Sequence, residues 1–298
     1  MNTSTITYVP RRTQILLRLA DYVELTKPKI ALLELMAVAA AAFCAGPDPV
    51  ILFHVLVGTS LVAASASAMN QWLERGVDCR MPRTAERPLA EGRMHSVEGL
   101  LFGLVTVVLG VGYLAFAVNL LTSVLGLVTW ILYVLVYTPL KSRTTANTLI
   151  GAVAGALPVL MGWAAMGAPL GIRAATLFMI LFLWQFPHFM AIAWIYRREY
   201  GHAGLQMLTV VDPTGRRAGG LAVVASLVLV PVSLLPAVAI SDNASIIYFG
   251  LALTLGLAQF GTAVRFLVRR DDSAAKWLLR ASLIYLPALL LLIVVTVP

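Results

Sequence analysis

The residues best suited to chemistry lie in one charged segment that directly follows an apolar run. This segment, NQWLERGVDCRMPRTAERPLAEGR from Asn70 to Arg93, holds four carboxylates and five arginines. Asn70, Glu74 and Asp78 are spaced at i, i+4 and i+8, so a helix that continues through them places all three along one flank. Mg²⁺ takes carboxylate and carbonyl oxygens as ligands and is completed by waters and substrate phosphates. The spacing therefore predicts a magnesium site at the end of a helix.

The basic residues of the same segment suit a phosphate group beside that metal. Guanidinium groups bind phosphate through paired hydrogen bonds and keep their charge. Carboxylates next to arginines are the pattern of a diphosphate site, although a solvated loop with the usual charge bias of membrane proteins explains the same spacing. Asn70 and Gln71 favour the site, since they lie just inside the apolar run, where uncompensated polarity is costly. The candidate arginines are Arg75, Arg80, Arg83 and Arg87.

Two further connections carry residues of the same kinds. The stretch WIYRREYGHAG has an acid beside arginines and tyrosines, and two such clusters on one membrane face can hold a metal diphosphate between them. Its candidate residues are Tyr196, Arg197, Arg198, Glu199 and Tyr200, with Glu199 as a fourth metal ligand. Lys141 and Arg143 add two cations at the same face. Gly151 and Gly155, which follow them, indicate close helix packing rather than chemistry.

His188 is a titratable side chain inside an apolar stretch, WQFPHFMAIAW. A histidine at such a position suits three roles: ligation of a haem iron, proton transfer, or a hydrogen bond to a backbone carbonyl that Pro187 frees. The residues alone leave all three roles open. The neighbouring aromatic side chains either line a pocket for a planar or isoprenoid molecule or serve packing, and they are Trp184, Phe186, Phe189 and Trp194.

The elements that must position these residues are membrane-spanning helices. Of the 298 residues, 60% are hydrophobic and 12% are charged, against about 25% charged in a soluble domain. Apolar runs of about 20 residues recur, which is the length that a spanning helix needs, and they lack the alternation of a β-barrel. The sequence predicts an all-α polytopic membrane protein with nine transmembrane helices in one bundle over residues 28–298. The expected spans are 28–46, 50–72, 97–115, 118–138, 147–167, 173–195, 218–240, 244–266 and 276–297.

The distribution of basic residues predicts the orientation of this bundle. With the N-terminal arm 1–27 in the cytoplasm, all of the 22 Lys and Arg residues except Arg173 fall on the cytoplasmic side, as the positive-inside rule requires. This distribution accounts for the net charge of +8 without a nucleic-acid partner. The arm shows no pattern of a cleaved signal peptide. Cys44 and Cys79 form no closely spaced pair, which argues against a zinc or disulfide site.

Four segments together resemble the protohaem IX farnesyltransferase family of the intramembrane polyprenyl transferase superfamily. They occur in the family's order and span most of the chain, and the combination N-Q-x-x-E-x-x-x-D-x-x-M-x-R-T-x-x-R-P-L is specific. The segments are ELTKPKI (24–30), NQWLERGVDCRMPRTAERPL (70–89), YTPLKSRTTANTLIGAVAGALPVLMGW (137–163) and WQFPHFMAIAWIYRREYGHAGLQML (184–208).

The resemblance implies both a fold and a reaction. The implied fold is a bundle of nine helices around a central cavity that opens toward lipid. The implied reaction is the Mg²⁺-dependent transfer of a farnesyl group from farnesyl diphosphate to the vinyl group of haem B, which gives haem O, a precursor of haem A. The resemblance also implies a place in the cell inner (plasma) membrane. The expected partners are the lipid bilayer and the membrane enzyme that next modifies the haem.

Roles for individual residues follow from the same resemblance. Asn70, Glu74 and Asp78 match a first acidic motif, and His188 matches a family histidine that we expect to bind haem. The basic positions near the diphosphate are Arg83, Arg87, Lys141 and Arg143, and the second polar motif is Tyr196, Arg197, Glu199 and Tyr200. Three positions depart from the family: Glu199 stands where aspartate is frequent, Ser142 separates Lys141 from Arg143, and Thr209 stands where proline is frequent.

Two other functions fit parts of the sequence. The first is prenylation of another aromatic acceptor, such as a quinone precursor or chlorophyllide, but this chain lacks the further aspartates common in the superfamily's first motif. The second is a transporter or a haem-binding membrane protein without catalysis. The paired acid and arginine connections disfavour it, because a permease has little use for a diphosphate site.

The distribution of basic residues makes orientation testable. We expect a reporter fused after Pro298 to lie outside the cytoplasm, because nine spans place the two ends of the chain on opposite sides of the membrane. Alkaline phosphatase and fluorescent-protein fusions at this position measure the outcome, with the same fusions after Thr145 as the cytoplasmic control. A fluorescent but phosphatase-inactive fusion after Pro298 would contradict the topology.

Overall fold

Helices make up nearly all of the chain described by the computed structural model, which covers residues 11–239 and 243–296, and no strand occurs in these two ranges. Within them, nine helical segments are long and apolar enough to cross a membrane. The predicted all-α class and nine spans are thus confirmed. The segments are α2 (Pro28–Ala45), α3 (Pro49–Asp78), α6 (Ser96–Ala117), α7 with η1 and α8 (Leu120–Ile131, Leu132–Tyr137 and Thr138–Leu140), α9 (Asn147–Ala165), α10 (Ile172–Ile195), α13 (Arg216–Leu234) with η2 (Leu235–Ala239), α14 (Asn243–Arg269) and α15 (Asp272–Thr296).

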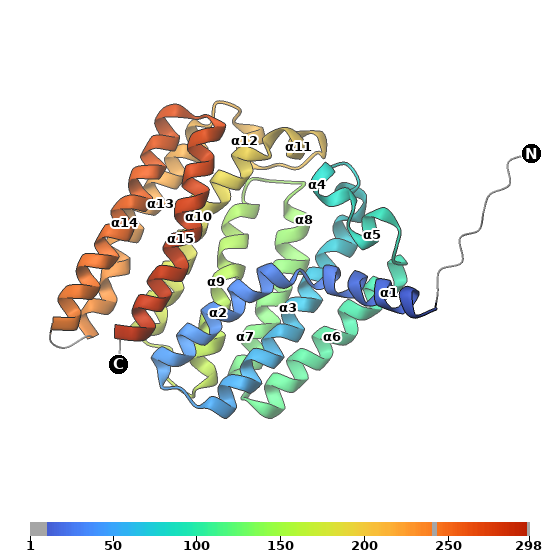
Figure 1. Ribbon diagram of the computed structural model, residues 1–298, viewed down its shortest axis with the longest axis horizontal. Coiled ribbons are helices and arrows are strands. Elements are labelled where there is room, and N and C mark those ends of the chain that lie inside the picture. The colour runs from blue at the N-terminus through green and yellow to red at the C-terminus, as the bar shows by residue number, and fades with distance from the viewer. Residues whose placement is uncertain (1–10, 240–242, 297–298) are drawn as a thin grey trace, which may run out of the picture.

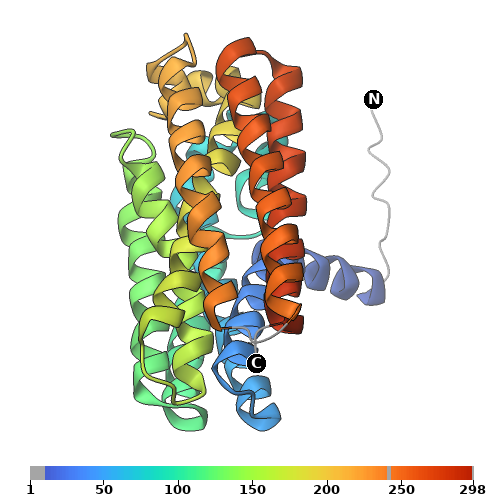
Figure 2. The ribbon, with the colours of Figure 1, turned by 90° about the vertical axis from the view of Figure 1, so that its left-hand side faces the viewer.

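Prolines and a capping aspartate determine where the first helices begin. Asp48 accepts hydrogen bonds from two backbone N–H groups in the first turn of α3, at 2.8 and 3.1 Å, and so caps that helix. Pro28 begins α2, and a residue before proline avoids the helical conformation. Lys27 accordingly interrupts the helix with a φ of 50°. The preceding helix, α1 (Arg11–Thr26), therefore turns away and lies crosswise to the spanning helices (Figures 1 and 2).

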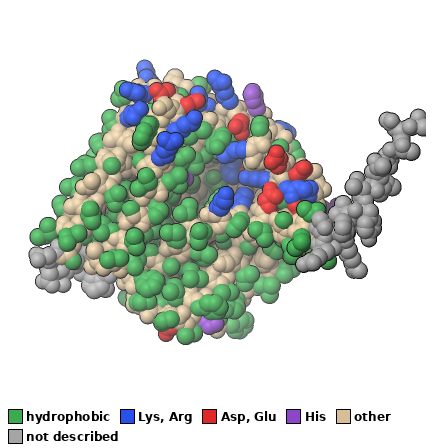
Figure 3. Space-filling model, in the orientation of Figure 1, with side chains coloured by type: hydrophobic (Ala, Val, Ile, Leu, Met, Phe, Trp, Pro, Cys, Tyr) green, Lys and Arg blue, Asp and Glu red, His purple; other side chains and the backbone are tan. Residues whose placement is uncertain are grey.

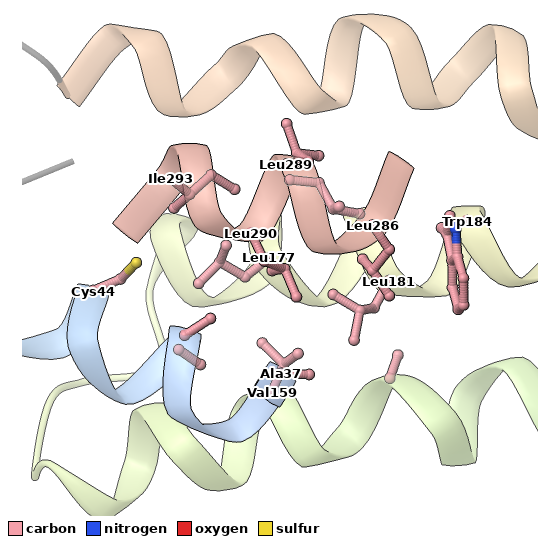
Figure 4. Close-up of a cluster of buried hydrophobic side chains, with 14 of the residues drawn as sticks. Ala37, Cys44, Val159, Leu177, Leu181, Trp184, Leu286, Leu289, Leu290 and Ile293 are labelled. Carbon is pink, nitrogen blue, oxygen red and sulfur yellow. The ribbon is translucent and has the colours of Figure 1, made fainter. Parts of the chain in front are cut away.

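The spanning helices form one bundle, and two of its apolar cores meet at α2 and α9. One core lies among α2, α9, α10, α13, α14 and α15 and includes Leu177 and Leu289 (Figure 4). The other lies among α2, α3, α6, α7, η1 and α9 and includes Leu114. Helices α2 and α9 contribute to both cores and approach closely, because a Cβ on Gly162 of α9 would meet the backbone carbonyl of Val38 in α2.

Four short helices gather at one end of the bundle. Helices α4 (Pro82–Ala85) and α5 (Pro88–Glu91) follow α3, whereas α11 (Arg197–His202) and α12 (Leu208–Val211) follow α10. Figure 1 shows all four at the same end, and Figure 3 shows charged side chains around a hollow near it, with mostly hydrophobic side chains over the rest of that side. We call this end the basic face; it is formed by the connections 79–95, 141–146, 196–215 and 270–271.

Candidate active site

The first acidic motif occupies the last turns of α3. The helix continues through Asp78, as the predicted spacing requires, so Asn70, Glu74 and Asp78 lie along one flank. Asn70 and Asp78 are each 1% exposed, and the side chain of Glu74 is 12% exposed. This flank therefore faces the inside of the bundle rather than water or lipid.

Each of these three side chains meets a basic residue from a different part of the chain. Every cation-to-oxygen distance is 2.8 Å, and the pairs are Glu74 with Lys141, Asp78 with Arg87, and Asn70 with Lys27. The pair of Glu74 and Lys141 is nearly enclosed, with side chains 12% and 13% exposed. Removing one partner of such a buried pair leaves the other charge uncompensated, which is strongly destabilising. The flank of α3 therefore gathers three cations at one place.

Lys27 is a site residue that sequence reasoning missed. It has a φ of 50°, a left-handed conformation that costs a residue with a side chain roughly 1–2 kcal/mol. Burial, followed by repulsion from Arg87 and Lys141, lowers the pKa of Lys27 to about 7. The lowered pKa indicates that positive charge outweighs negative charge around Lys27. The sequence offered one signal for Lys27, because it is the lysine before proline in ELTKPKI. That segment carries part of the family resemblance, but it had no role of its own.

The π-helical segment η1 positions Lys141. Directly after it, Thr138 accepts a hydrogen bond from Asn70 Nδ2 at 3.1 Å and donates one to a carbonyl of η1 at 2.8 Å. Such π segments often occur at functional sites. The Lys141 ammonium group lies 4.7 Å from the centroid of the Tyr137 ring. Burial by itself lowers the pKa of Lys141, but attraction by the Glu74 carboxylate outweighs burial, so the pKa is raised and Lys141 stays charged.

Arg83 joins the second polar connection to the first. Its guanidinium group donates to the Tyr200 hydroxyl at 2.6 Å. The same group lies 4.2 and 4.9 Å from the ring centroids of Tyr196 and Tyr200. The backbone N–H of Gln206 donates to the carbonyl of Lys141 at 2.7 Å, which ties the connection between α8 and α9 into the same assembly. The polar connections of the basic face thus form one structural unit.

Some carboxylate oxygens at the basic face are buried and accept no hydrogen bond from the described residues. They include Asp78 Oδ1 and Glu199 Oε2. Unsatisfied buried acceptors are costly, and unused carboxylate oxygens fit a hard cation such as Mg²⁺. Over residues 11–239 and 243–296, no three His, Cys, Asp or Glu side chains form a ready metal-binding group. A Mg²⁺ ion here would therefore need phosphate and water oxygens to complete its coordination.

Among the described residues, five of the candidate cations make no side-chain hydrogen bond or ion pair with the acidic motif or with the tyrosines of the second polar connection. They are Arg75, Arg80, Arg143, Arg197 and Arg198. Arg197 donates to Asp272 at the start of α15, at 2.7 Å, and Arg75 donates to a carbonyl of its own helix. The other three are exposed. Contact of these five side chains with a diphosphate stays a prediction.

His188 of α10 lies inside the bundle, where its ring stacks on Trp184 with 4.8 Å between centroids. Its Nδ1 is 2.9 Å from Ser282 Oγ of α15, and this hydroxyl donates to the carbonyl of Leu279 at 2.7 Å. A serine hydroxyl has one proton to donate, so Ser282 must accept from the Nδ1–H of His188. Nε2 then carries the lone pair, which suits a metal ligand or a proton acceptor. Of the three roles that the sequence leaves open, the hydrogen bond to a backbone carbonyl is not the contact observed, because Nδ1 meets a serine hydroxyl instead.

A family model and individual proteins match this chain over most of its length. The model of the UbiA prenyltransferase family matches residues 31–286. A protoheme IX farnesyltransferase from Solibacter usitatus (strain Ellin6076) is 41% identical over 279 residues, which cover 90% of this chain and 95% of that protein. A protein of the same name from Koribacter versatilis (strain Ellin345) is 41% identical over 284 residues, which cover 91% of each chain.

Solved structures share the fold. A UbiA homolog from Archaeoglobus fulgidus bound to GPP and Mg²⁺ has a TM-score of 0.68 at 17% identity, with 92% of this chain and 99% of that chain covered. A structure of digeranylgeranylglyceryl phosphate synthase has a TM-score of 0.76 at 16% identity, with 94% and 98% covered. The family model spans most of the membrane bundle, and the relatives match at high identity and coverage. The chain therefore belongs to the UbiA prenyltransferase family.

Proposed function

We propose that this protein transfers the farnesyl group of farnesyl diphosphate to a vinyl group of haem B, forming haem O and diphosphate. Relatives named protoheme IX farnesyltransferase, 41% identical over 90% of the chain, support this reaction. The structural observation that carries the proposal is the set of three cations held 2.8 Å from oxygens of Asn70, Glu74 and Asp78. Charge for a diphosphate and oxygens for a metal meet there, at one end of an apolar bundle.

Lys27, Lys141 and Arg87 supply the positive charge for the diphosphate. Each of them neutralises or hydrogen-bonds an oxygen on α3. A diphosphate that enters beside them offers further acceptors, and charge-assisted hydrogen bonds to phosphate are short and strong. Neutralising the leaving group stabilises the charge that develops as the allylic C1–O bond breaks. Arg83, held by Tyr196 and Tyr200, adds a fourth cation at the rim of the same assembly.

The oxygens of α3 that these cations contact are also suitable for Mg²⁺. Asn70, Glu74 and Asp78, together with Glu199, would hold the ion, and the unpartnered Asp78 Oδ1 and Glu199 Oε2 favour this role. Bound Mg²⁺ supplies further neutralisation of the diphosphate charge. The Archaeoglobus fulgidus homolog with GPP and Mg²⁺ supports metal dependence for this chain as well.

His188 is placed to bind the acceptor haem. Ser282 fixes the ring and its tautomer, as second partners do for metal-ligating histidines. His188 lies seven residues, about 10 Å of helix rise, before the end of α10. Asn70 lies eight residues before the end of α3. An iron bond from Nε2 would therefore hold the porphyrin at about the depth of the diphosphate site.

The apolar interior of the bundle protects the reaction from early hydrolysis. The farnesyl cation reacts readily with water, so it must meet the vinyl group in a space from which water is excluded. The two apolar cores provide such an interior. We place the reaction in the cell inner (plasma) membrane with the basic face toward the cytoplasm, and the next haem-modifying membrane enzyme would receive the product.

Replacing Lys27 by Met should weaken the binding of inorganic pyrophosphate with Mg²⁺ by about tenfold, or ~1.4 kcal/mol. The substitution removes one of three cations that face the diphosphate. It also relieves repulsion from Arg87 and Lys141, so the ligand-free variant should be at least as stable as the wild type. Thermal unfolding in detergent at increasing pyrophosphate concentrations measures both effects. Equal stabilisation of both proteins by pyrophosphate would exclude Lys27 from the diphosphate site.

Replacing Glu74 by Ala should lower haem O formation by about 10²-fold or more, with the protein still in the membrane. The substitution removes a metal ligand and leaves Lys141 without its partner. The assay incubates purified protein with haem B, farnesyl diphosphate and Mg²⁺, and mass spectrometry identifies the pigment. Glu86→Ala, an exposed acid of the same connection, is the matched control and should stay active. Full activity in both Glu74→Ala and Asp78→Ala would end the metal-site proposal.

Replacing His188 by Ala should weaken haem B binding and change the absorbance spectrum of the bound haem, because the iron loses its protein ligand. Ser282→Ala should keep a haem spectrum of the wild-type kind with a lower affinity, since only the orienting hydrogen bond is lost. Titration of detergent-solubilised protein with haem B, followed by absorbance, measures both properties. An unchanged spectrum in the His188 variant would show that another group binds the iron.

A further inference from the structure

Glu34 is an acid within a membrane helix that the site described above does not use. It lies in α2, six residues after Pro28, which corresponds to about 9 Å of helix rise. The buried neighbours on its side of the helix are Ala37, Val38 and Ala41, at 2%, 0% and 1% exposure. Leu33 and Met36, on the outer side, are 37% and 41% exposed. The helical repeat therefore points Glu34 toward the inside of the bundle.

The carboxyl group of Glu34 has no hydrogen-bond or ion-pair partner among the described residues. Glu74 and Asp78, by contrast, each have a cation at 2.8 Å. An isolated acid inside a membrane bundle is costly, and such residues usually serve a function. The packing of the protein itself therefore gives no reason for an acid at this position.

Glu34 lies on α2, the helix at the boundary between two apolar cores of the bundle. Glu34 keeps partial exposure: Ile30, one turn before it, is 63% exposed, whereas Ala37 and Val38, one turn after it, are enclosed. Helix α2 lies between the two apolar cores, because Ala37 belongs to one core and Val38 to the other. The hollow in Figure 3 lies on this side of the molecule, between α2 and the basic face. Glu34 thus lies beyond Lys27 along α2, which runs away from the basic face (Figure 1).

The proposed reaction contains a step to which no residue has yet been assigned. The vinyl π electrons form the new C–C bond to farnesyl C1, while the C1–O bond breaks and its electron pair leaves with the diphosphate. The remaining cation lies on the vinyl carbon next to the porphyrin. Haem O carries a hydroxyl group there, so a lone pair of water must form a C–O bond and one water proton must pass to a base.

We propose that Glu34 holds this water and accepts its proton, an inference that rests on the proposed function. The proton passes from the water to a carboxylate oxygen of Glu34 and then to solvent as the product leaves. A cation that forms near Glu34 favours the ionised carboxylate, since opposite charges attract. Glu34 lies farther from the basic face than the diphosphate site does. A water held by Glu34 therefore meets the porphyrin-side cation rather than farnesyl C1, which lies beside the diphosphate.

The identity of the product tests this assignment. The amide in Glu34→Gln fills the same space but accepts no proton, so the cation should instead lose a proton from its neighbouring methylene group. The product is then an alkene lighter than haem O by one water. We expect haem O formation to fall by about 10²-fold, the lower end of what a general base contributes, while diphosphate release continues. Mass spectrometry of the pigment and a diphosphate assay, with haem B, farnesyl diphosphate and Mg²⁺, measure both.

Two further variants separate a chemical role from a structural one. Glu34→Asp keeps a carboxylate and should restore part of the hydroxylated product. Leu33→Ala, the neighbouring outward-facing position, should give the wild-type product.

Three results would overturn the role of Glu34. They are haem O from Glu34→Gln at the wild-type rate, loss of diphosphate release in both Glu34 variants, and loss of folding in both. Failure of the wild-type protein to farnesylate haem B would instead overturn the proposed function.

Discussion

Two buried carboxylates at the end of a membrane helix constrain much of this structure. Glu74 and Asp78 face inward from α3, where an uncompensated charge is strongly destabilising. Their partners come from distant segments, so the chain must return Lys141 through η1 and Arg87 through the turns after α3. The connections of the basic face are therefore fixed by charge compensation rather than being free loops. The positive-inside rule accounts for the gathering of these cations at one end of the bundle, and the ion pairs explain their exact neighbours.

The same charge pairs bring basic side chains from distant segments of the chain together. Three basic side chains lie together there, and Lys27 is held in place by a left-handed backbone conformation. Unusual backbone conformations of this kind persist where surrounding structure enforces them, and they cluster at functional sites. Here the enforcing groups are Pro28, which ends α1, and the hydrogen bond to Asn70. The left-handed conformation of Lys27 lowers the stability of the fold at this junction, which fits a role of Lys27 in binding.

Polarity falls from the basic face toward the interior of the bundle. Charged residues crowd the ends of α3 and α10, whereas Glu34 is an isolated acid that lies farther from the basic face. This gradient suits a reaction between a water-soluble diphosphate group and two apolar partners, because the leaving group and the carbon cation need opposite environments. The closely packed helices α2 and α9 join the two apolar cores that enclose the deeper region.

Sequence alone determined the fold class, the nine spans and the residues of the first acidic motif, because apolar run length and i, i+4 spacing are local properties of the chain. The sequence also indicated correctly that Gly151 serves close packing, because its missing Cβ makes room for Tyr137. Only the tertiary structure decided which cation meets which carboxylate, that Lys27 belongs to the site, and that Arg197 turns to Asp272 instead. It also decided the tautomer of His188, through a serine from α15. These facts depend on contacts between residues far apart in the chain, which no local pattern specifies.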